Sequence, residues 1–151
     1  MSPRLRAWLL ALFTTVLVIG IDQATKAAVR SSLALGESRK LFLGIDLSYV
    51  RNKGVAFGFF GGGGAIVTVL TSLALVALLL YFVLRTTTPL LWLPTGLVLG
   101  GSLGNLWDRA RDGAVTDFID PEFWPAFNFA DICIVVGVLG LLYVIERPHR
   151  T

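Results

Sequence analysis

The sequence predicts a membrane protein that is mainly α-helical, with four transmembrane helices and a small outward-facing β-sheet. Two observations support this fold class. Only 15% of the 151 residues are charged and 55% are hydrophobic, whereas an ordinary soluble domain has roughly 25% charged residues. Long uncharged runs recur along the chain, with short segments of alternating polar and apolar residues between them. We therefore interpret residues 1–151 as a single membrane domain.

The first predicted span, 7–29, starts as an apolar run that ends at Ile21. Asp22 and Lys26 follow, four residues apart on one helix face, where they can pair and let the helix continue to about residue 29. The basic and apolar start also fits a secretory signal peptide. No small-x-small cleavage site follows the apolar run, so we favour a retained span.

The other three predicted spans are the runs 65–84, 88–107 and 126–145. The run 65–84 has 20 residues without a charge, and a helix of that length is about 30 Å long, the thickness of the hydrocarbon core. The run 88–107 contains prolines and glycines, which are tolerated where neighbouring helices satisfy the freed backbone groups. The run 126–145 is interrupted only by Asp131.

An even number of spans places both termini on one side of the membrane. Both are basic, with Arg4 and Arg6 at the start and Arg147 and Arg150 at the end, which predicts cytoplasmic termini. Arg85, in the turn between the second and third spans, is the fifth basic residue on this side, and the opposite side carries eight. Nine of the ten acids lie at or beyond the outer ends of the spans, so we expect any chemistry to face outward. The net charge of +3 is explained by attraction to anionic lipid and predicts no nucleic-acid partner.

Two predicted outer segments, 30–64 and 108–125, are long enough to fold. In the first, Ile45, Leu47 and Tyr49 alternate with polar residues, a pattern typical of a half-buried strand. The run RNKGVAFGFF that follows has a turn signal and then aromatic residues spaced to lie on a membrane surface. In the second segment, AVTDFID predicts another short strand. We expect a small sheet over the outer mouth of the helices.

Single residue types exclude several mechanisms. The one cysteine, Cys133, cannot form an internal disulfide and has the setting of a small buried hydrophobic residue. The one histidine, His149, lies in a basic tail. A zinc site with histidine and cysteine ligands, or a Ser-His-Asp triad, has nothing to be built from. We expect no metal and no other cofactor.

Two aspartates are the first candidates for chemistry, because each lies among aliphatic and aromatic residues beside an apolar segment. They are Asp117 in VTDFID and Asp131 in FNFAD. An acid kept at a bilayer boundary is costly and usually functional. A third polar group closes the third span, where Asn105, Asp108 and Arg109 recur on one helix face in GGSLGNLWDR. A small-residue packing seam with a charged end explains this group as well as a functional face does.

Five motifs occur in a fixed order: DQATK, NKGVAF, GGSLGNLWDR, VTDFID and FNFAD. In these motifs and their order the chain resembles the lipoprotein signal peptidases, also called signal peptidase II, which are aspartic endopeptidases of the bacterial inner membrane. The resemblance covers nearly the whole chain.

This resemblance implies that Asp117 and Asp131 are the catalytic pair, on the outer side of the membrane. The implied substrate is a lipid-modified prolipoprotein, cut immediately before its diacylglyceryl-cysteine. We expect a monomer in contact with membrane lipid. Residues that would support the site or bind the substrate are Asn52, Gly54, Asn105, Arg109, Asn128, Asp22, Lys26 and Asp108.

Two carboxyls held near each other cannot both be ionised cheaply, so Asp117 and Asp131 should share a proton. One would act as base on a water molecule while the other protonates the carbonyl oxygen of the scissile bond. Asp131, at a helix start, is favoured as the anion by the helix dipole. Asp117, between Thr116 and Phe118 on a strand, should be the easier one to keep protonated.

Two other classes of function stay open from the residues alone. A small proton- or ion-coupled transporter would also place Asp22, Asp108 and Asp131 near a membrane, although such proteins usually have internal repeats and acids near the midplane. A Ser-Lys peptidase would use Lys26, Lys40 or Lys53 beside a serine. The five motifs contain one serine, Ser102 in GGSLGNLWDR, and no lysine is part of that motif.

Overall fold

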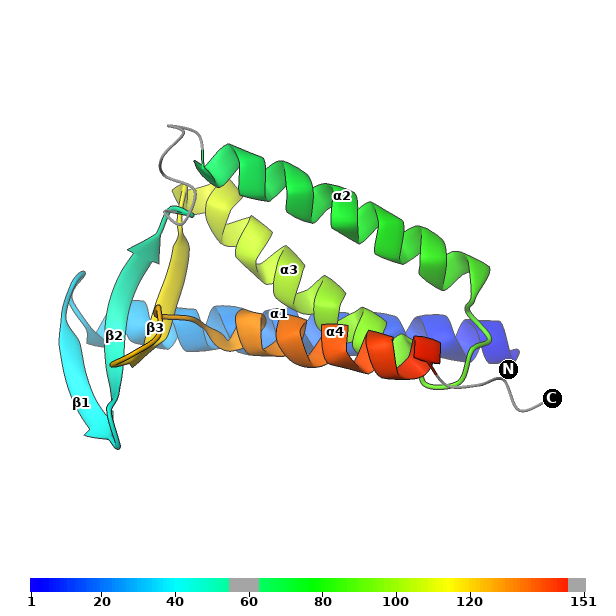
Figure 1. The fold of residues 1–151 in the computed structure, drawn as a ribbon, viewed down its shortest axis with the longest axis horizontal. Helices are drawn as coiled ribbons and strands as arrows, with labels where there is room; N and C mark the ends of the chain where they lie inside the picture. The colour runs from blue at the N-terminus through cyan, green and yellow to red at the C-terminus, as the bar shows by residue number, and fades with distance from the viewer. Residues whose placement is uncertain (55–62, 147–151) are drawn as a thin grey trace.

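The computed structural model describes residues 1–54 and 63–146. Within these residues the chain forms four helices and three strands (Figure 1). The run of aromatics predicted after Gly54, together with His149, lies outside the described residues. The helices are α1 (Pro3–Ser32), α2 (Gly63–Leu84), α3 (Trp92–Asp112) and α4 (Phe129–Glu146), and the strands are β1 (Ser38–Phe42), β2 (Ile45–Asn52) and β3 (Val115–Pro121).

The helices run along the long axis of the molecule and the sheet lies across one end of them (Figure 1). α1 begins and α4 ends at the opposite end. We call these the sheet end and the far end. α1 is one continuous helix through Lys26, as predicted from the Asp22 and Lys26 spacing.

α3 packs between α1 and α4 and also contacts α2. Its glycines allow close approach on both sides. A Cβ added at Gly100 would lie 2.6 Å from Val18 Cβ on α1, and one added at Gly101 would lie 2.5 Å from the Ala130 carbonyl oxygen on α4. The expected close packing of this glycine-rich segment is confirmed.

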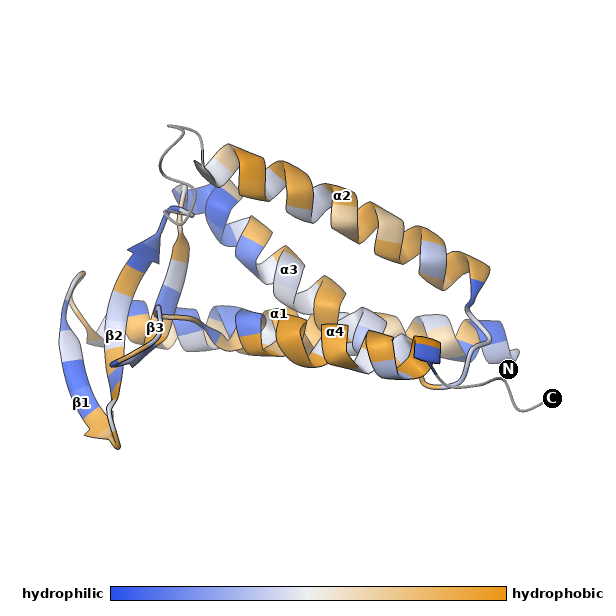
Figure 2. Ribbon diagram, viewed as in Figure 1, coloured by the Kyte–Doolittle hydropathy of each residue, from blue (hydrophilic) through white to orange (hydrophobic). Residues whose placement is uncertain are grey.

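Among the described residues, three helices are long and apolar enough to cross a membrane: Pro3–Ser32, Gly64–Leu84 and Phe129–Glu146. Figure 2 shows α2 and α4 as largely hydrophobic, whereas α3 is hydrophilic toward the sheet end. Many residues of α3 are buried, so they face protein rather than lipid and need not be apolar. The predicted span 88–107, which α3 would provide, stays a prediction.

The sheet is antiparallel, in the order β1-β2-β3. The strands predicted around Leu47 and in VTDFID are confirmed as β2 and β3. β1 was not predicted, because all five of its residues are exposed and an exposed edge strand has no alternating apolar pattern to signal it. Leu47 and Tyr49 of β2 pack against a small apolar core of Val29, Leu33 and Phe118, which attaches the sheet to the end of α1.

The far end has a different core, made of apolar side chains from all four helices and the loop before α3. Trp8 packs edge-on against Phe82, with ring centroids 4.9 Å apart. We call this core the apolar cluster, and its buried members are Ala7, Ala11, Phe82, Leu91 and Val144.

Candidate active site

β3 and the segment before α4 lie side by side at the sheet end. The Phe127 N–H donates to the Ile119 carbonyl at 2.9 Å, and the Ile119 N–H donates back to the Phe127 carbonyl at 2.9 Å. This pairing places Asn128, the residue before α4, next to Asp117 in the middle of β3. The two chain segments that carry the predicted aspartates therefore converge.

Asn128 links the two aspartates. Its Oδ1 accepts from the Asp131 N–H at 3.1 Å, and its own N–H donates to Asp131 Oδ2 at 3.1 Å. This reciprocal pair is a capping box, which explains why α4 begins at Phe129, three residues after the start of the predicted span 126–145. The Asn128 Nδ2 donates to Asp117 Oδ1 at 2.7 Å. The structure thus brings Asp117 and Asp131 together around one fully buried amide.

Two further amides reach the remaining carboxylate oxygens. Asn52, at the end of β2, donates from Nδ2 to Asp117 Oδ2 at 2.9 Å. Asn105 of α3 donates from Nδ2 to Asp131 Oδ1 at 2.8 Å. The Asn52 side chain is itself fixed, because its Oδ1 accepts from the Gly54 N–H at 2.8 Å. Gly54 has a φ of 80°, a conformation that favours glycine.

Asp117 is 2% exposed. The pKa of Asp117 is raised to about 6: burial is the largest cause and the negative charge of Asp131 adds to it, while hydrogen bonds from Asn52 and Asn128 and the charge of Lys26 oppose the rise. The direction agrees with the expectation that Asp117 is the aspartate more easily kept protonated.

Behind these groups lies a fully buried ion cluster. The Lys26 ammonium contacts Asp22 Oδ2 at 2.8 Å and Asp108 Oδ2 at 2.9 Å, which confirms the predicted pairing of Asp22 with Lys26. Lys26 also donates to Asn105 Oδ1 at 2.9 Å. Through Asn105 the cluster is connected to Asp131 and the rest of the site.

Gln23 belongs to this network and was missed by the sequence interpretation. Its Nε2 donates to Asp22 Oδ2 at 3.1 Å and to Asp108 Oδ1 at 3.0 Å. The available signal was its position in DQATK, between the two charged residues that were singled out.

Arg109 lies beside the network. Its Nε is buried without a hydrogen-bond partner in the part of the chain that the structure describes, and its charge interacts with Asp131, Asp117 and Asp108. Arg109 and Lys53 line a hollow of about 410 Å³ together with Thr68 of α2. Two cationic side chains therefore line this hollow, and neither Asp117 nor Asp131 lines it.

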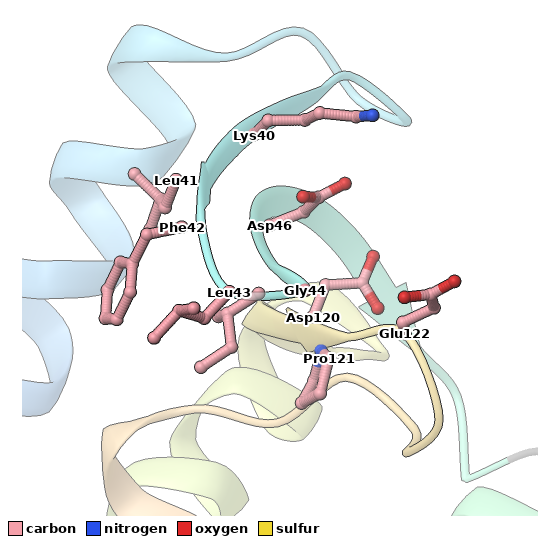
Figure 3. A pocket seen from close by; sticks show the side chains of 10 residues that line it. Lys40, Leu41, Phe42, Leu43, Gly44, Asp46, Asp120, Pro121 and Glu122 are labelled. Carbon is pink, nitrogen blue, oxygen red and sulfur yellow. The ribbon is translucent and has the colours of Figure 1, made fainter.

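A second hollow, of about 550 Å³, lies at the turn between β1 and β2 and is lined by neither Asp117 nor Asp131. Figure 3 shows apolar side chains, including Phe42 and Leu43, on one side of it and the charged Asp46 and Asp120 on the other. Among residues 1–54 and 63–146, no group of three or more His, Cys, Asp or Glu side chains is placed to hold a metal ion.

Most of the predicted site residues thus form one hydrogen-bonded network, with Gly54 attached through Asn52. Arg109 stands next to it rather than inside it. The predicted residues in the continuous network, which Gln23 joins as an addition, are Asp22, Lys26, Asn52, Asn105, Asp108, Asp117, Asn128 and Asp131.

Known proteins are similar to this chain over most of its length. A lipoprotein signal peptidase from Halothermothrix orenii is 36% identical over 136 residues, covering 89% of this chain and 94% of that protein. One from Syntrophomonas wolfei is 43% identical over 131 residues, covering 86% and 88%. A solved bacterial membrane enzyme, determined by the in meso method, superposes with a TM-score of 0.80 at 28% identity, covering 91% of this chain and 92% of that one.

The family model described as signal peptidase (SPase) II matches residues 14–146. This range contains all the motifs on which the resemblance was based and every residue of the network. The chain belongs to the signal peptidase II family.

Proposed function

We propose that this protein is an aspartic lipoprotein signal peptidase that cleaves diacylglyceryl-modified prolipoproteins immediately before the lipidated cysteine, with Asp117 and Asp131 as the catalytic pair. The observation that carries the proposal is the meeting of these two aspartates around Asn128, in a chain of the signal peptidase II family. The similar proteins from Halothermothrix orenii and Syntrophomonas wolfei are lipoprotein signal peptidases, and nothing in the comparisons supports the alternative of a transporter.

The proposed reaction uses the two carboxyls in different protonation states. Asp131, at the start of α4, is stabilised as the anion by the helix dipole and by the N–H of Asn128, so it accepts a proton from the attacking water. Asp117, whose pKa burial raises to about 6, donates its proton to the carbonyl oxygen. The water oxygen bonds to the carbonyl carbon and gives a gem-diol. The carbon–nitrogen bond then breaks, the proton held by Asp131 passes to the leaving amine, and one hydroxyl of the gem-diol returns its proton to Asp117 as the new carboxyl group forms.

Arg109 is proposed to orient the substrate. Its Nε is buried without a partner in the described residues, and a buried donor left unsatisfied is costly. A backbone or ester carbonyl of the lipopeptide would satisfy it. Holding the scissile bond in place in this way makes a weak nucleophile such as water effective.

The proposed topology has four crossings, with α3 as the additional one, and outer segments at 30–64 and 108–125. α3 lies along α1 and α4, so a membrane crossed by those two would also contain α3. Because α1 begins and α4 ends at the far end, both termini would be cytoplasmic and the sheet end would face outward. We propose that the enzyme works as a monomer in the bacterial inner membrane.

A Ser-Lys mechanism has less support. The Lys26 ammonium lies between two carboxylates, so it is not free to take a proton from a serine. Within the described residues none of the hydrogen bonds of Lys26 involves a serine.

The test uses the purified full chain in lipid nanodiscs and a synthetic prolipoprotein peptide carrying a diacylglyceryl-cysteine. Mass spectrometry should find a product that begins with the lipidated cysteine. The same peptide without the lipid is the control and should be cleaved far more slowly. Added hydroxylamine would convert an acyl-enzyme into a hydroxamate, and such a product, or equal cleavage of both peptides, would contradict the proposal.

A further inference from the structure

We propose that the ion cluster of Asp22, Lys26 and Asp108 is a clamp that sets the position of Asp117 relative to Asp131. The inference rests on the proposed function, because it assigns positioning residues to the proposed catalytic pair. None of the three clamp residues has to touch the substrate.

Each carboxylate of the clamp holds the backbone directly before one catalytic aspartate. Asp108 Oδ2 accepts from the N–H of Thr116, the residue before Asp117, at 3.2 Å. Asp22 Oδ1 accepts from the N–H of Ala130, the residue before Asp131, at 3.2 Å. Lys26 holds the two carboxylates together from α1. The separation of the two backbone segments is therefore set by one shared ammonium group.

Lys26 also determines how Asn105 is oriented. An ammonium group can only donate hydrogen bonds, so it must face the amide oxygen. Lys26 Nζ accordingly donates to Asn105 Oδ1 at 2.9 Å, which leaves Asn105 Nδ2 to donate to Asp131 Oδ1 at 2.8 Å. If the Asn105 amide were reversed, its oxygen would face the Asp131 carboxylate and could not donate a hydrogen bond to it. The clamp thus fixes the side chain of Asp131 as well as its backbone.

The composition of the cluster supports a positioning role. Neutralising Lys26 requires only one carboxylate, yet two are buried with it, and burying charge is costly even in a pair. A second carboxylate is explained if each one holds a different segment. Gly104 leaves room for the Asp22 side chain, because a Cβ at this position would lie only 2.6 Å from Asp22 Oδ2.

The hydrogen bonds of Asp22 and Asp108 predict that replacing aspartate by asparagine has different effects at the two positions. Asp22 uses one oxygen for Ala130 and the other for Lys26, so the single oxygen of Asp22→Asn cannot serve both. Asp108 uses the same oxygen for Thr116 and Lys26 and its other oxygen for Gln23, so the amide oxygen of Asp108→Asn can keep the Thr116 and Lys26 contacts and only the Gln23 hydrogen bond is lost. Either variant leaves Lys26 with one carboxylate, a neutral buried pair. Lys26→Met would instead leave two carboxylates unneutralised and is not an informative test.

The experiment measures kcat on the lipidated peptide per molecule of binding-competent enzyme. The competent fraction is the binding stoichiometry of an uncleavable analogue whose scissile amide is reduced. We expect kcat to fall about 100-fold in Asp22→Asn, as for a small misplacement of reacting groups, and less than about 10-fold in Asp108→Asn, with KM changed little in both.

Two further variants separate positioning from stability. Asp108→Leu keeps the Lys26–Asp22 pair but removes the Thr116 arm, so kcat should fall about 100-fold even if Asp22→Asn does not fold. Leu91→Ala, in the apolar cluster at the far end, should lower the melting temperature and leave kcat per competent enzyme unchanged.

The clamp is overturned if Asp108→Leu, or a folded Asp22→Asn, keeps the wild-type kcat per competent enzyme and only melts earlier. A larger loss in Asp108→Asn than in Asp22→Asn would also contradict it. Failure of the wild-type enzyme to cleave the lipidated peptide would reject the proposed function instead, so the two failures are distinguishable.

Discussion

The two ends of the helix bundle are built from opposite kinds of side chain. At the far end, the apolar cluster packs hydrocarbon against hydrocarbon around Phe82 and Leu91. At the sheet end, charged and amide side chains such as Lys26, Asp108 and Asn128 are buried just as completely. Burying polar groups is costly unless every one of them is hydrogen-bonded. Among the described residues, buried charged side chains occur at the sheet end only, where the network brings Asp117 and Asp131 together.

This contrast implies a division of labour. Substitutions at the sheet end should change the rate of cleavage, whereas substitutions at the far end should change stability and leave the rate alone. The following predictions test that separation, beginning with the largest effect.

Asn128→Ala should have a large effect on activity. The Asn128 side chain donates to Asp117 Oδ1 and accepts from the Asp131 N–H, so its loss frees one oxygen of the Asp117 carboxyl group and removes the cap that holds the backbone of Asp131. We expect kcat on the lipidated peptide to fall about 100-fold. Ser2→Ala is the matched control, because it also removes a helix cap, the bond from the Leu5 N–H to Ser2 Oγ, but at the far end. Equal activity losses in the two variants would reduce the role of Asn128 to capping.

The pH dependence of cleavage should follow Asp117. Burial raises the pKa of Asp117 to about 6, so this group loses the proton that it must donate as the pH rises through that value. We expect kcat/KM to fall on the alkaline side, by roughly tenfold per pH unit beyond an apparent pKa of about 6.

Asn52→Ala tests whether the alkaline limb of the pH–rate profile reports the titration of Asp117. The hydrogen bond from Asn52 lowers the pKa of Asp117 because it favours the charged form. Its removal should therefore move the alkaline limb of the pH–rate profile to higher pH. A limb that moves to lower pH, or not at all, would show that the profile does not report Asp117.

Leu91→Ala should change stability rather than rate. Leu91 is fully buried in the apolar cluster, and the cavity left behind should lower the free energy of unfolding by about 2 kcal/mol, near the lower end of the range for buried leucines. Thermal or denaturant unfolding in detergent micelles measures the loss. A changed kcat per competent enzyme would break the separation between the two ends.

Glu37→Gln should have the smallest effect. Glu37 pairs with Arg39 at 2.9 Å, but both side chains are exposed, and exposed ion pairs contribute little. We expect neither kcat nor the melting temperature to change measurably. An altered kcat would show that the site extends along the outer part of the sheet.

The sequence predicted the elements that carry strong periodic or compositional signals. Uncharged runs predicted α2 and α4, and alternation predicted β2 around Leu47. β1 has no buried residue, so no pattern marked it. α3 gave a mixed signal because a helix surrounded by other helices uses glycine and polar residues where a lipid-facing helix uses leucine.

The residues of the site were predictable, but the connections between them were not. Motif order pointed to Asp117, Asp131, Asn105 and Asn128. That Asp22 holds the N–H of Ala130, more than a hundred positions away, depends on how α1, α3 and α4 pack. Backbone donors such as the Thr116 N–H have no residue type to mark them in a sequence.

The most direct test of the central claim compares Asp117→Asn and Asp131→Asn with the wild-type enzyme on the lipidated prolipoprotein peptide. Both variants should bind the uncleavable analogue with wild-type stoichiometry, and both should lose at least about 100-fold in kcat, the loss typical for removal of a general acid or base. Wild-type turnover by either variant would contradict the assignment of this pair as the catalytic groups.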